Sequence, residues 1–410
     1  DLAANAGRTA VSVGFDQSPE VHAVAAAINS ALDNVGTTVN YLTVPHFDDQ
    51  NNKTAFSEVV SEIAAGDFDA VVIIGSNPIL TAPSDSDFAS ALSGASEVFQ
   101  LSTYNDETGK AASWHLGRSH YLEAWGDGYS FGGARSVIQP QIQPLHDTLS
   151  EIEFLGAIVN AGQVNGYDLV RETFSSFYSR NFENRWLDIL HDGIDITDGY
   201  SVSNRSIRSV SPATSTSISG LEVVFKADNS VYDGRYANLG WLQELPDPIT
   251  KITWDNVALM SASTATSLGI DTDSPLGEAK QQIVTIAVNG QSIQMAAWVQ
   301  PGHADDSITV HTGYGREGIG RVADVQTNSS QLLDKSATSG GVNVYPIRTS
   351  SAMLFGAAEA SLISGTYEIA SVQDHHSLEG RDMYRQASLK KYKEKPDYAT
   401  FKSVHKYAVP

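Results

Sequence analysis

One stretch of the sequence, Asp233 to Asn256, separates two different patterns of apolar residues. Before it, short β-branched runs alternate with apolar residues at helical spacing, which is typical of an α/β domain. After it, alternating apolar and polar residues indicate strands. The stretch itself carries two tryptophans, Trp241 and Trp254, and two prolines that stiffen the backbone. We therefore expect a rigid connector whose tryptophans are buried between two folded bodies.

The charge of the chain excludes two classes of partner. The 410 residues include 48 acidic and 26 basic side chains, which gives a formal net charge of −22. Such a surface repels the phosphates of nucleic acids and anionic lipids, so we expect neither as a partner. The acidity indicates either adaptation to high salt, which we favour, or docking to a basic partner.

The sequence contains no cysteine. Disulfides, cysteine nucleophiles, thiolate zinc sites and cysteine-ligated iron–sulfur clusters are therefore excluded from these residues. No apolar run approaches the roughly 20 residues needed to cross a bilayer, so we expect no direct membrane span. Because the sequence begins at Asp1 without a signal-peptide pattern, we expect a processed piece of a longer protein.

The first half is predicted to be a doubly wound α/β domain spanning residues 1–195. The run Ala70–Ile74 is continuously apolar and mostly β-branched, as in a parallel strand buried on both faces. It leads into Gly75, Ser76 and Asn77, a turn at the carboxyl edge where such sheets bind ligands. The remaining expected elements of this half are strands at 9–14, 39–44 and 98–104, and helices from 19, near 56–63, near 85–92 and from about 167 to 191.

The second half is predicted to be a small β-barrel over residues 233–385. Its clearest element is a hairpin, in which 282–288 and 291–299 are joined by Asn289 and Gly290. The other expected elements are strands at 307–312, 342–347 and 367–372 and a short helix at 263–268. Residues 196–232 are expected to be a linker leading into the barrel, and 386–410 a basic, lysine-rich tail leading to a further domain.

A glycine-rich segment follows one of these strands. Gly313, Gly315 and Gly318 match the G-x-G-x-x-G pattern of dinucleotide-binding proteins, but no helix is expected after them. A nicotinamide or flavin fingerprint is therefore not predicted. The exposed amides of such a loop, together with Arg316, could hold a phosphate or an acidic group of a partner.

Two groups of residues have the composition of metal ligands. The first contains His303, Asp305, Asp306 and His311, and the second is the segment Asp374–His376. In a chain this acidic, surface loops account for both groups, so we predict no metal site. The sequence also lacks a G-x-S-x-G elbow, a P-loop and an H-E-x-x-H motif, and we predict no catalytic residue.

Five segments spread over almost the whole chain carry a family resemblance. The segments are Asp233–Asn256, His120–Asp127, Gln139–Pro144, Gly313–Arg316 and Gln373–Arg381. Together they closely resemble the molybdopterin oxidoreductase-like subunit of the bacterial alternative complex III, which oxidises quinol in respiration. The segment Asn256–Gly269 is similar to the start of the barrel that holds the pterin dinucleotide in the wider family.

The resemblance implies a fold and a set of site residues. The two halves would be the later α/β domain and the C-terminal double-psi β-barrel of a molybdoenzyme. The cofactor-binding positions would be Gly75, Ser76, Asn77, Asn256, Gly313, Tyr314, Gly315 and Arg316. One departure weakens cofactor binding: the glycine–aspartate pair expected after the first barrel helix is replaced by the sequence from Leu268 to Glu278.

The resemblance also implies a biological setting. In alternative complex III this subunit keeps the fold without the molybdenum cofactor, so we expect a non-catalytic module without a cofactor. The alternative is half of an active enzyme that binds molybdopterin guanine dinucleotide. A longer parent would supply residues before Asp1 and an iron–sulfur domain after Pro410. Its partners would be a multihaem cytochrome c and membrane quinol-binding subunits, on the periplasmic side of the bacterial inner membrane.

Overall fold

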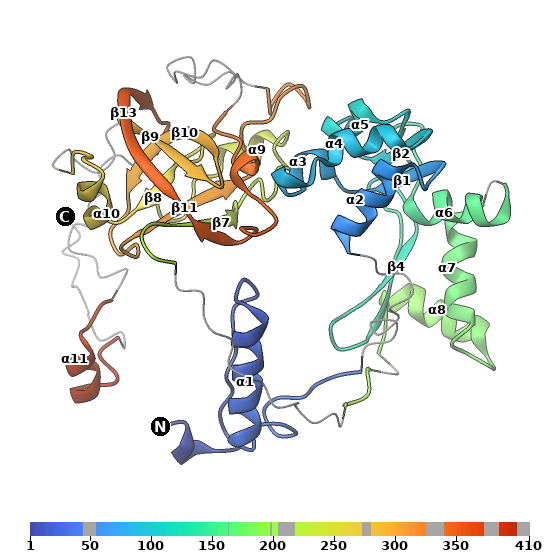
Figure 1. Ribbon diagram of the computed structural model, residues 1–410. Helices are drawn as coiled ribbons and strands as arrows, with labels where there is room; N and C mark the ends of the chain where they lie inside the picture. The colour runs from blue at the N-terminus through green and yellow to red at the C-terminus, as the bar shows by residue number, and fades with distance from the viewer. Residues whose placement is uncertain are drawn as a thin grey trace, which may run out of the picture.

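The structure, a computed structural model, consists of two bodies and an N-terminal arm (Figure 1). It describes residues 1–43, 55–162, 164–196, 199–203, 218–272, 280–324, 340–372 and 385–399. The helices are α1 (Pro19–Ala31), α2 (Phe56–Ala65), α3 (Pro78–Thr81), α4 (Phe88–Ala91), α5 (Glu107–Ala111), α6 (Glu151–Asn160), α7 (Gly166–Ser175), α8 (Phe182–Asp192), α9 (Gly240–Glu244), α10 (Ala262–Ser267) and α11 (Leu389–Glu394).

The strands fall into three sheets. The first contains β1 (Ala70–Ile74), β2 (Glu97–Ser102) and β3 (Trp114–Gly117). The second contains β4 (Gly126–Tyr129), β5 (Arg135–Ile138) and β6 (Ile194–Asp195). The third contains β7 (Glu222–Ala227), β8 (Ala258–Met260), β9 (Lys280–Val288), β10 (Gln291–Val299), β11 (Ser307–Thr312), β12 (Phe355–Ala357) and β13 (Glu359–Glu368).

The α/β half is built on the parallel sheet of order β1-β2-β3. The predicted strand Ala70–Ile74 is confirmed as β1. One face of this sheet is covered by α2 and α4, where Ile73 packs with Val60, Ile63 and Phe88 in a common core. The turn Gly75–Asn77 follows β1 directly and leads into α3, as the sequence predicts.

Three predicted elements of this half are wrong. The segments 9–14 and 39–43 are not strands of a sheet, although the first is extended. The expected long helix from 167 to 191 is two helices, α7 and α8. The break falls at Asn181, whose φ of 55° lies in the left-handed region, which a helix interior cannot contain. The two helices then bury Phe174 and Trp186 against the antiparallel sheet of β4, β5 and β6.

The second half is a mixed sheet of order β12-β7-β11-β8-β10-β9-β13. The predicted hairpin is confirmed: β9 and β10 are antiparallel, and Asn289 and Gly290 both have positive φ. Alternation along β9 places Ile283 in one core and Val284 in the other. In the described chain β12 and β13 end the order without pairing to each other, so closure into a barrel stays a prediction.

Three details of this half differ from the sequence prediction. The segment 342–347 is not a strand, because a 3-10 helix containing Pro346 occupies Tyr345–Ile347. The range expected as a linker, 196–232, contains β7, which lies inside the sheet between β12 and β11. The predicted strand 367–372 has the wrong bounds, because β13 covers Glu359–Glu368 and shares only its last two residues with the predicted range. Within the described part of the tail, α11 is a short helix with an exposed surface.

The connector Asp233–Asn256 is anchored differently from our expectation. Trp241 is 90% exposed on α9, so its predicted burial is wrong. Gln243 of the same helix points inward instead, where its Nε2 donates to the backbone oxygen of Ala237 over 2.8 Å. The end of the connector, from Thr250 to Asn256, is largely buried. The connector is therefore fixed through its C-terminal part and not through Trp241.

Substituting Trp241, with the buried Trp186 of α8 as a comparison, tests this arrangement. We expect Trp241→Ala to change the free energy of unfolding by less than about 0.5 kcal/mol, since an exposed ring loses few contacts. Trp186→Ala, which empties a site only 2% exposed, is expected to cost about 3–5 kcal/mol. Urea denaturation of both variants measures the difference, and a large loss for Trp241→Ala would contradict the exposed position.

No helix in the described parts of the chain has both the length and the apolar character needed to cross a bilayer.

Candidate functional site

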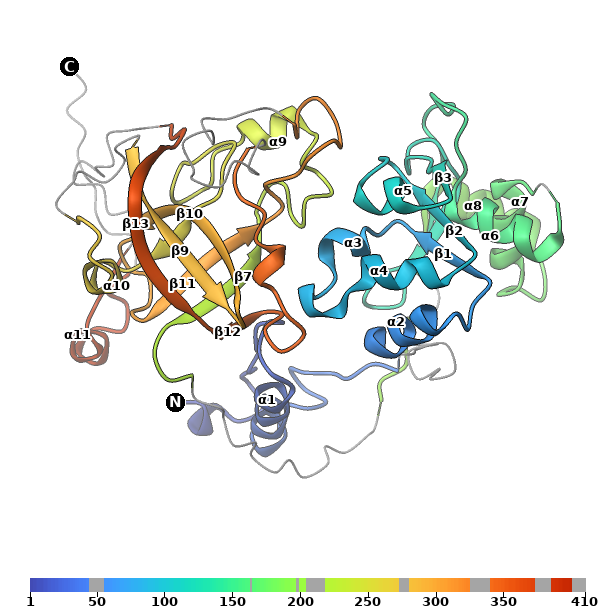
Figure 2. The same ribbon diagram turned by 45° about the horizontal axis from the view of Figure 1, so that its top comes forward.

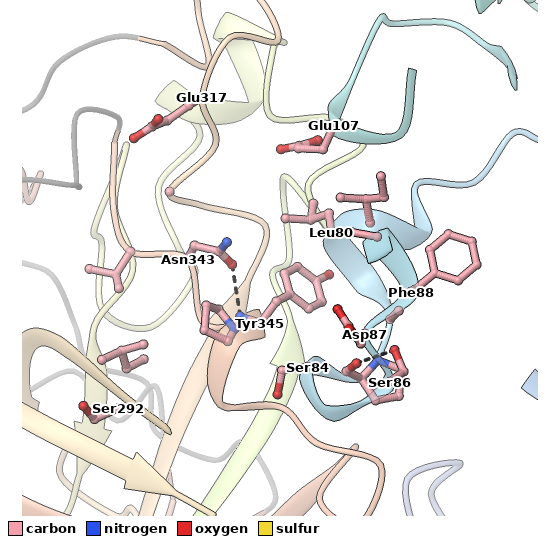
Figure 3. Close-up of a pocket in the computed structure, with 18 of the residues that line it drawn as sticks. Leu80, Ser84, Ser86, Asp87, Phe88, Glu107, Ser292, Glu317, Asn343 and Tyr345 are labelled. Atoms are coloured by element: carbon pink, nitrogen blue, oxygen red, sulfur yellow. Dashed lines mark hydrogen bonds between the residues drawn. The ribbon is translucent and has the colours of Figure 1, made fainter. Parts of the chain in front are cut away.

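A cleft of about 690 Å³ lies between the two bodies. The α/β half supplies one wall, mainly from the segment between Ile79 and Ala89, which contains α3 and the start of α4. The other wall comes from Ser292–Gln294 of β10, from Gly341–Asn343 and from the 3-10 helix with Tyr345. Figure 3 shows Tyr345 and Asn343 on one side and Leu80, Asp87 and Phe88 on the other.

Two predicted site residues, Asn77 and Arg316, meet at the rim of this cleft through a third residue, Glu107. Arg316 donates from Nε to Glu107 Oε1 over 2.7 Å and from Nη2 to Oε2 over 2.6 Å. Asn77 Nδ2 donates to the same Oε2 over 2.7 Å. The third nitrogen of the guanidinium, Nη1, donates to the backbone oxygen of Gly234 over 2.7 Å. The pair thus joins the two bodies by a bidentate contact.

The surroundings of Glu107 favour the charged form of its carboxyl. Partial burial of Glu107 would raise the pKa of its carboxyl, but the hydrogen bonds and charge of Arg316, with the amide of Asn77, outweigh this effect. The net result is a pKa below the usual value of a glutamate. The side chain of Arg316 is only 4% exposed. Arg316 is therefore a buried cation, and each of its three nitrogens already donates one hydrogen bond within the protein.

The glycines of the glycine-rich loop are required by packing. A Cβ at Gly315 would lie 2.0 Å from the backbone nitrogen of Asn343, and one at Gly313 would lie 2.8 Å from the oxygen of Tyr232. Both residues also have positive φ. Their small size thus allows two loops of the same chain to touch. Gly315 alone of the predicted loop residues also lines the cleft.

The predicted residues of the first turn differ in their exposure. Gly75 and Ser76 are exposed, and a Cβ at Gly75 would approach Nη1 of Arg118 to 3.1 Å. The side-chain oxygen of Asn77 accepts hydrogen bonds from the backbone nitrogen and hydroxyl of Thr108. Asn77 therefore ties the turn to α5 in addition to holding Glu107.

Asn256 and Tyr314 lie together at a second, much smaller cavity of about 20 Å³. Asn256 Nδ2 donates to the oxygens of His311 and Val342, and its Oδ1 accepts from the nitrogen of Val342. Tyr314 is 6% exposed, and burial together with the nearby Asp228 and Asp255 raises the pKa of its hydroxyl. Both residues thus act as buried links between loops.

Asp255 is the most perturbed acid beside this cavity. Burial raises the pKa of its carboxyl to about 7, although Tyr367 donates a hydrogen bond to it and the nitrogen of Asn256 donates another. Burial also lowers the pKa of His311, another residue of this cavity, against the charges of Asp228 and Asp247. The cavity therefore brings several buried ionisable side chains together, and its volume is about that of one water molecule.

The candidate metal ligands of the first group contact different parts of the protein. His303 Nε2 bonds with the hydroxyl of Thr309, Asp305 accepts from Ser261, and His311 lines the small cavity. No group of three or more potential ligands that could hold a metal occurs among the residues that the structure describes. The segment Asp374–His376 lies outside the described residues.

Glu107 is the site residue that the sequence prediction missed. Asp106 caps α5 by accepting from the nitrogens of Thr108 and Gly109, so Asp106-Glu107 has the local pattern of a helix start. That pattern could have located α5 and placed Glu107 in its first turn. It contains no information about a partner 209 residues away in the sequence.

Of three comparisons with known proteins, only the comparison with solved structures found a match. No protein-family model matches the sequence, and no curated protein matches it. Among solved structures, the chain is similar to acetylene hydratase from Pelobacter acetylenicus, with a TM-score of 0.50 and 13% sequence identity. The fold is molybdopterin oxidoreductase-like. The match covers 74% of this chain but only 46% of the acetylene hydratase chain, and at this identity the likeness concerns the fold alone.

Proposed function

We propose that this chain is a structural module, without a pterin cofactor, of a respiratory quinol:electron acceptor oxidoreductase of the alternative complex III type. The molybdopterin oxidoreductase-like fold and the five sequence segments that resemble the family support this assignment. The ion pair between Arg316 and Glu107 is the main support for the proposal that no cofactor is bound.

The chemistry of the cleft argues against a pterin dinucleotide. Such a group carries phosphates, which need cations or free N–H donors. The nearest predicted phosphate ligand, Arg316, is neutralised by Glu107 and is not among the residues that line the cleft. The described lining contains three carboxylates, Asp87, Glu107 and Glu317, and neither lysine nor arginine. The residues present therefore do not fit the cofactor.

In this role the chain would hold other parts of an assembly in position. Electron transfer would take place on iron–sulfur clusters of a domain after Pro410 and on haems of a partner cytochrome c. Membrane quinol-binding subunits would be further partners, on the periplasmic side of the bacterial inner membrane. The absence of cysteine from the chain supports this division of labour, because any iron–sulfur cluster then needs ligands from elsewhere.

The alternative is that the cleft binds molybdopterin guanine dinucleotide in an active enzyme. The cleft volume, about 690 Å³, lies in the range of small-molecule sites and favours this alternative. Binding would require Glu107 to release Arg316, so that the guanidinium could bind a phosphate in its place.

Analysis of the parent protein distinguishes the two functions. The purified parent is denatured and oxidised, pterin fluorescence is recorded, and molybdenum and tungsten are measured by elemental analysis, with a known molybdopterin enzyme treated in parallel. We expect neither pterin nor metal from the parent and a clear signal from the control. Stoichiometric pterin would overturn the proposal. If no four-cysteine motifs follow Pro410 in the gene, the assignment to a respiratory complex fails separately.

A further inference from the structure

We propose that the N-terminal arm docks onto the free edge of β1, where Thr9–Val13 adds a fourth parallel strand and α1 covers the bare face of the sheet. This docking would place a further segment, the turn Gly14–Ser18, beside the turn Gly75–Asn77 at the carboxyl edge of the sheet.

The segment Thr9–Val13 already has the conformation of a strand with one edge free. Its side chains alternate, since Thr9, Val11 and Val13 are half-buried while Ala10 and Ser12 are exposed. The Asn29 side chain of α1 accepts from the nitrogen of Val11 over 2.9 Å and donates to its oxygen over 2.8 Å. Because backbone groups of successive residues point to opposite edges, those of Ala10 and Ser12 face away from Asn29.

The receiving surface on the α/β half is β1. It ends the order β1-β2-β3, so one of its edges carries backbone groups that no strand of the described sheet pairs with. On one face, Val71 and Ile73 pack in the core under α2. On the other face, Val72 is 43% exposed, although the run Ala70–Ile74 has the composition of a strand buried on both sides.

The arm carries an apolar surface that is suited to cover this exposed face of the sheet. Val21, Val24 and Ile28 form one stripe on α1 and are 42%, 46% and 36% exposed. Both views show α1 separated from the sheet of β1 and β2 (Figures 1 and 2). Since α2 occupies one face of β1 and Asn29 fixes α1 to Thr9–Val13, the face beside Val72 is the one open to α1.

The chain connection agrees with a parallel pairing. Parallel neighbours need a crossover of a dozen or more residues, usually helical, and α1 and α2 both lie between Thr9–Val13 and β1 in the sequence. The arm and the edge belong to the same chain, so no second molecule is required.

Docking has a direct consequence for the carboxyl edge of the sheet. In a parallel sheet the carboxyl ends of the strands meet at one edge, which is the edge that carries ligand sites. The turn Gly14–Ser18, which includes Phe15 at 91% exposure, would then lie beside Gly75–Asn77. Docking is independent of whether the cleft holds a cofactor, so its failure would leave the proposed function untouched.

Crosslinking of paired cysteines tests the docking, and the cysteine-free sequence makes the reaction specific. A Val24→Cys/Val72→Cys variant of the full chain is treated with a short bismaleimide, and the products are separated by size. We expect an intramolecular crosslink within the monomer. The matched control is Val24→Cys/Val159→Cys, which places the second thiol on α6, where Val159 is 83% exposed, and should give little product.

A third substitution, added to the Val24→Cys/Val72→Cys variant, distinguishes strand pairing from random collisions between the arm and the sheet. Ser12→Pro removes an N–H from the pairing edge and leaves the bonds of Val11 to Asn29 in place. We expect it to lower the yield of the Val24–Val72 crosslink by about tenfold. Absence of the monomeric crosslink, equal yield from the control pair, or crosslinked dimers alone would overturn the proposal, the last by showing that a second copy occupies the edge.

Discussion

Replacing Glu107 by alanine is expected to lower the free energy of unfolding by about 2–3 kcal/mol. The substitution leaves the buried guanidinium of Arg316 without its carboxylate, and removing one partner of a buried pair commonly costs about 3–5 kcal/mol. We expect a value below that range because the side chain of Glu107 is 24% exposed and water can replace part of the contact. Urea denaturation at neutral pH measures the loss.

An exposed ion pair of the same chain is the matched control. Arg171 and Glu183 form a similar contact, but the side chain of Glu183 is 76% exposed. Glu183→Ala should therefore change stability very little, since water and ions replace an exposed partner. Equal effects of Glu183→Ala and Glu107→Ala would contradict a special role for the pair between the two bodies.

The effect of Glu107→Ala is also expected to depend on pH. The pKa of Glu107 is lowered in the folded protein, so its stabilising contribution is complete above the ordinary pKa of a glutamate. The contribution is lost as the pH falls through the lower, folded-state pKa. The difference between the original chain and the variant should therefore narrow in acid and stay constant from neutral to mildly alkaline pH.

Replacing Asp255 by asparagine is expected to stabilise the protein at alkaline pH. The folded-state pKa of Asp255 is about 7, whereas an aspartate in the unfolded chain has a pKa of about 3.9. Folding thus favours the protonated form, and the original chain loses stability as the pH rises from about 4 to about 7. Asparagine has nearly the same shape and stays neutral, so the variant avoids this loss.

The size of this effect follows from the shift in pKa. Between pH 5 and pH 8 the advantage of Asp255→Asn should grow by about 2–3 kcal/mol. Urea denaturation at the two pH values measures it, with Asp271→Asn, an exposed aspartate, as a control that should show no such growth. An advantage of Asp255→Asn that is the same at both pH values would contradict the raised pKa of Asp255.

Local sequence patterns predicted the elements whose cause is local. Ala70–Ile74 is a strand because a continuous β-branched run favours burial in a sheet, and Asn289-Gly290 is a turn because both residues tolerate positive φ. The break at Asn181 was missed because the apolar residues of α7 and α8 share one spacing across it. Nothing in that spacing marks a left-handed residue.

The site was predictable only in part. Asn77 and Arg316 were selected from short patterns, and the structure does bring them together, but through Glu107, which no pattern linked to either. The exposure of Trp241 was missed because ring size indicates a preference for burial, whereas the orientation of α9 is set by contacts such as that of Gln243 with Ala237. Such choices depend on tertiary packing, which a single sequence does not encode locally.

The contacts between the two bodies have a mechanical consequence. Among the described residues, hydrogen bonds join the bodies in two groups. In the first, Arg316 donates to Glu107 and Lys110 donates to the oxygen of Glu317. In the second, Ser350 donates to Asp85, the nitrogen of Ser84 donates to the oxygen of Arg348, and Arg348 donates to the oxygen of Thr81. Two bodies that are joined at two points can still rotate relative to each other about the line through those points. The width of the cleft is the coordinate that such a rotation changes. A segment that contacted both walls at a third point would fix that width.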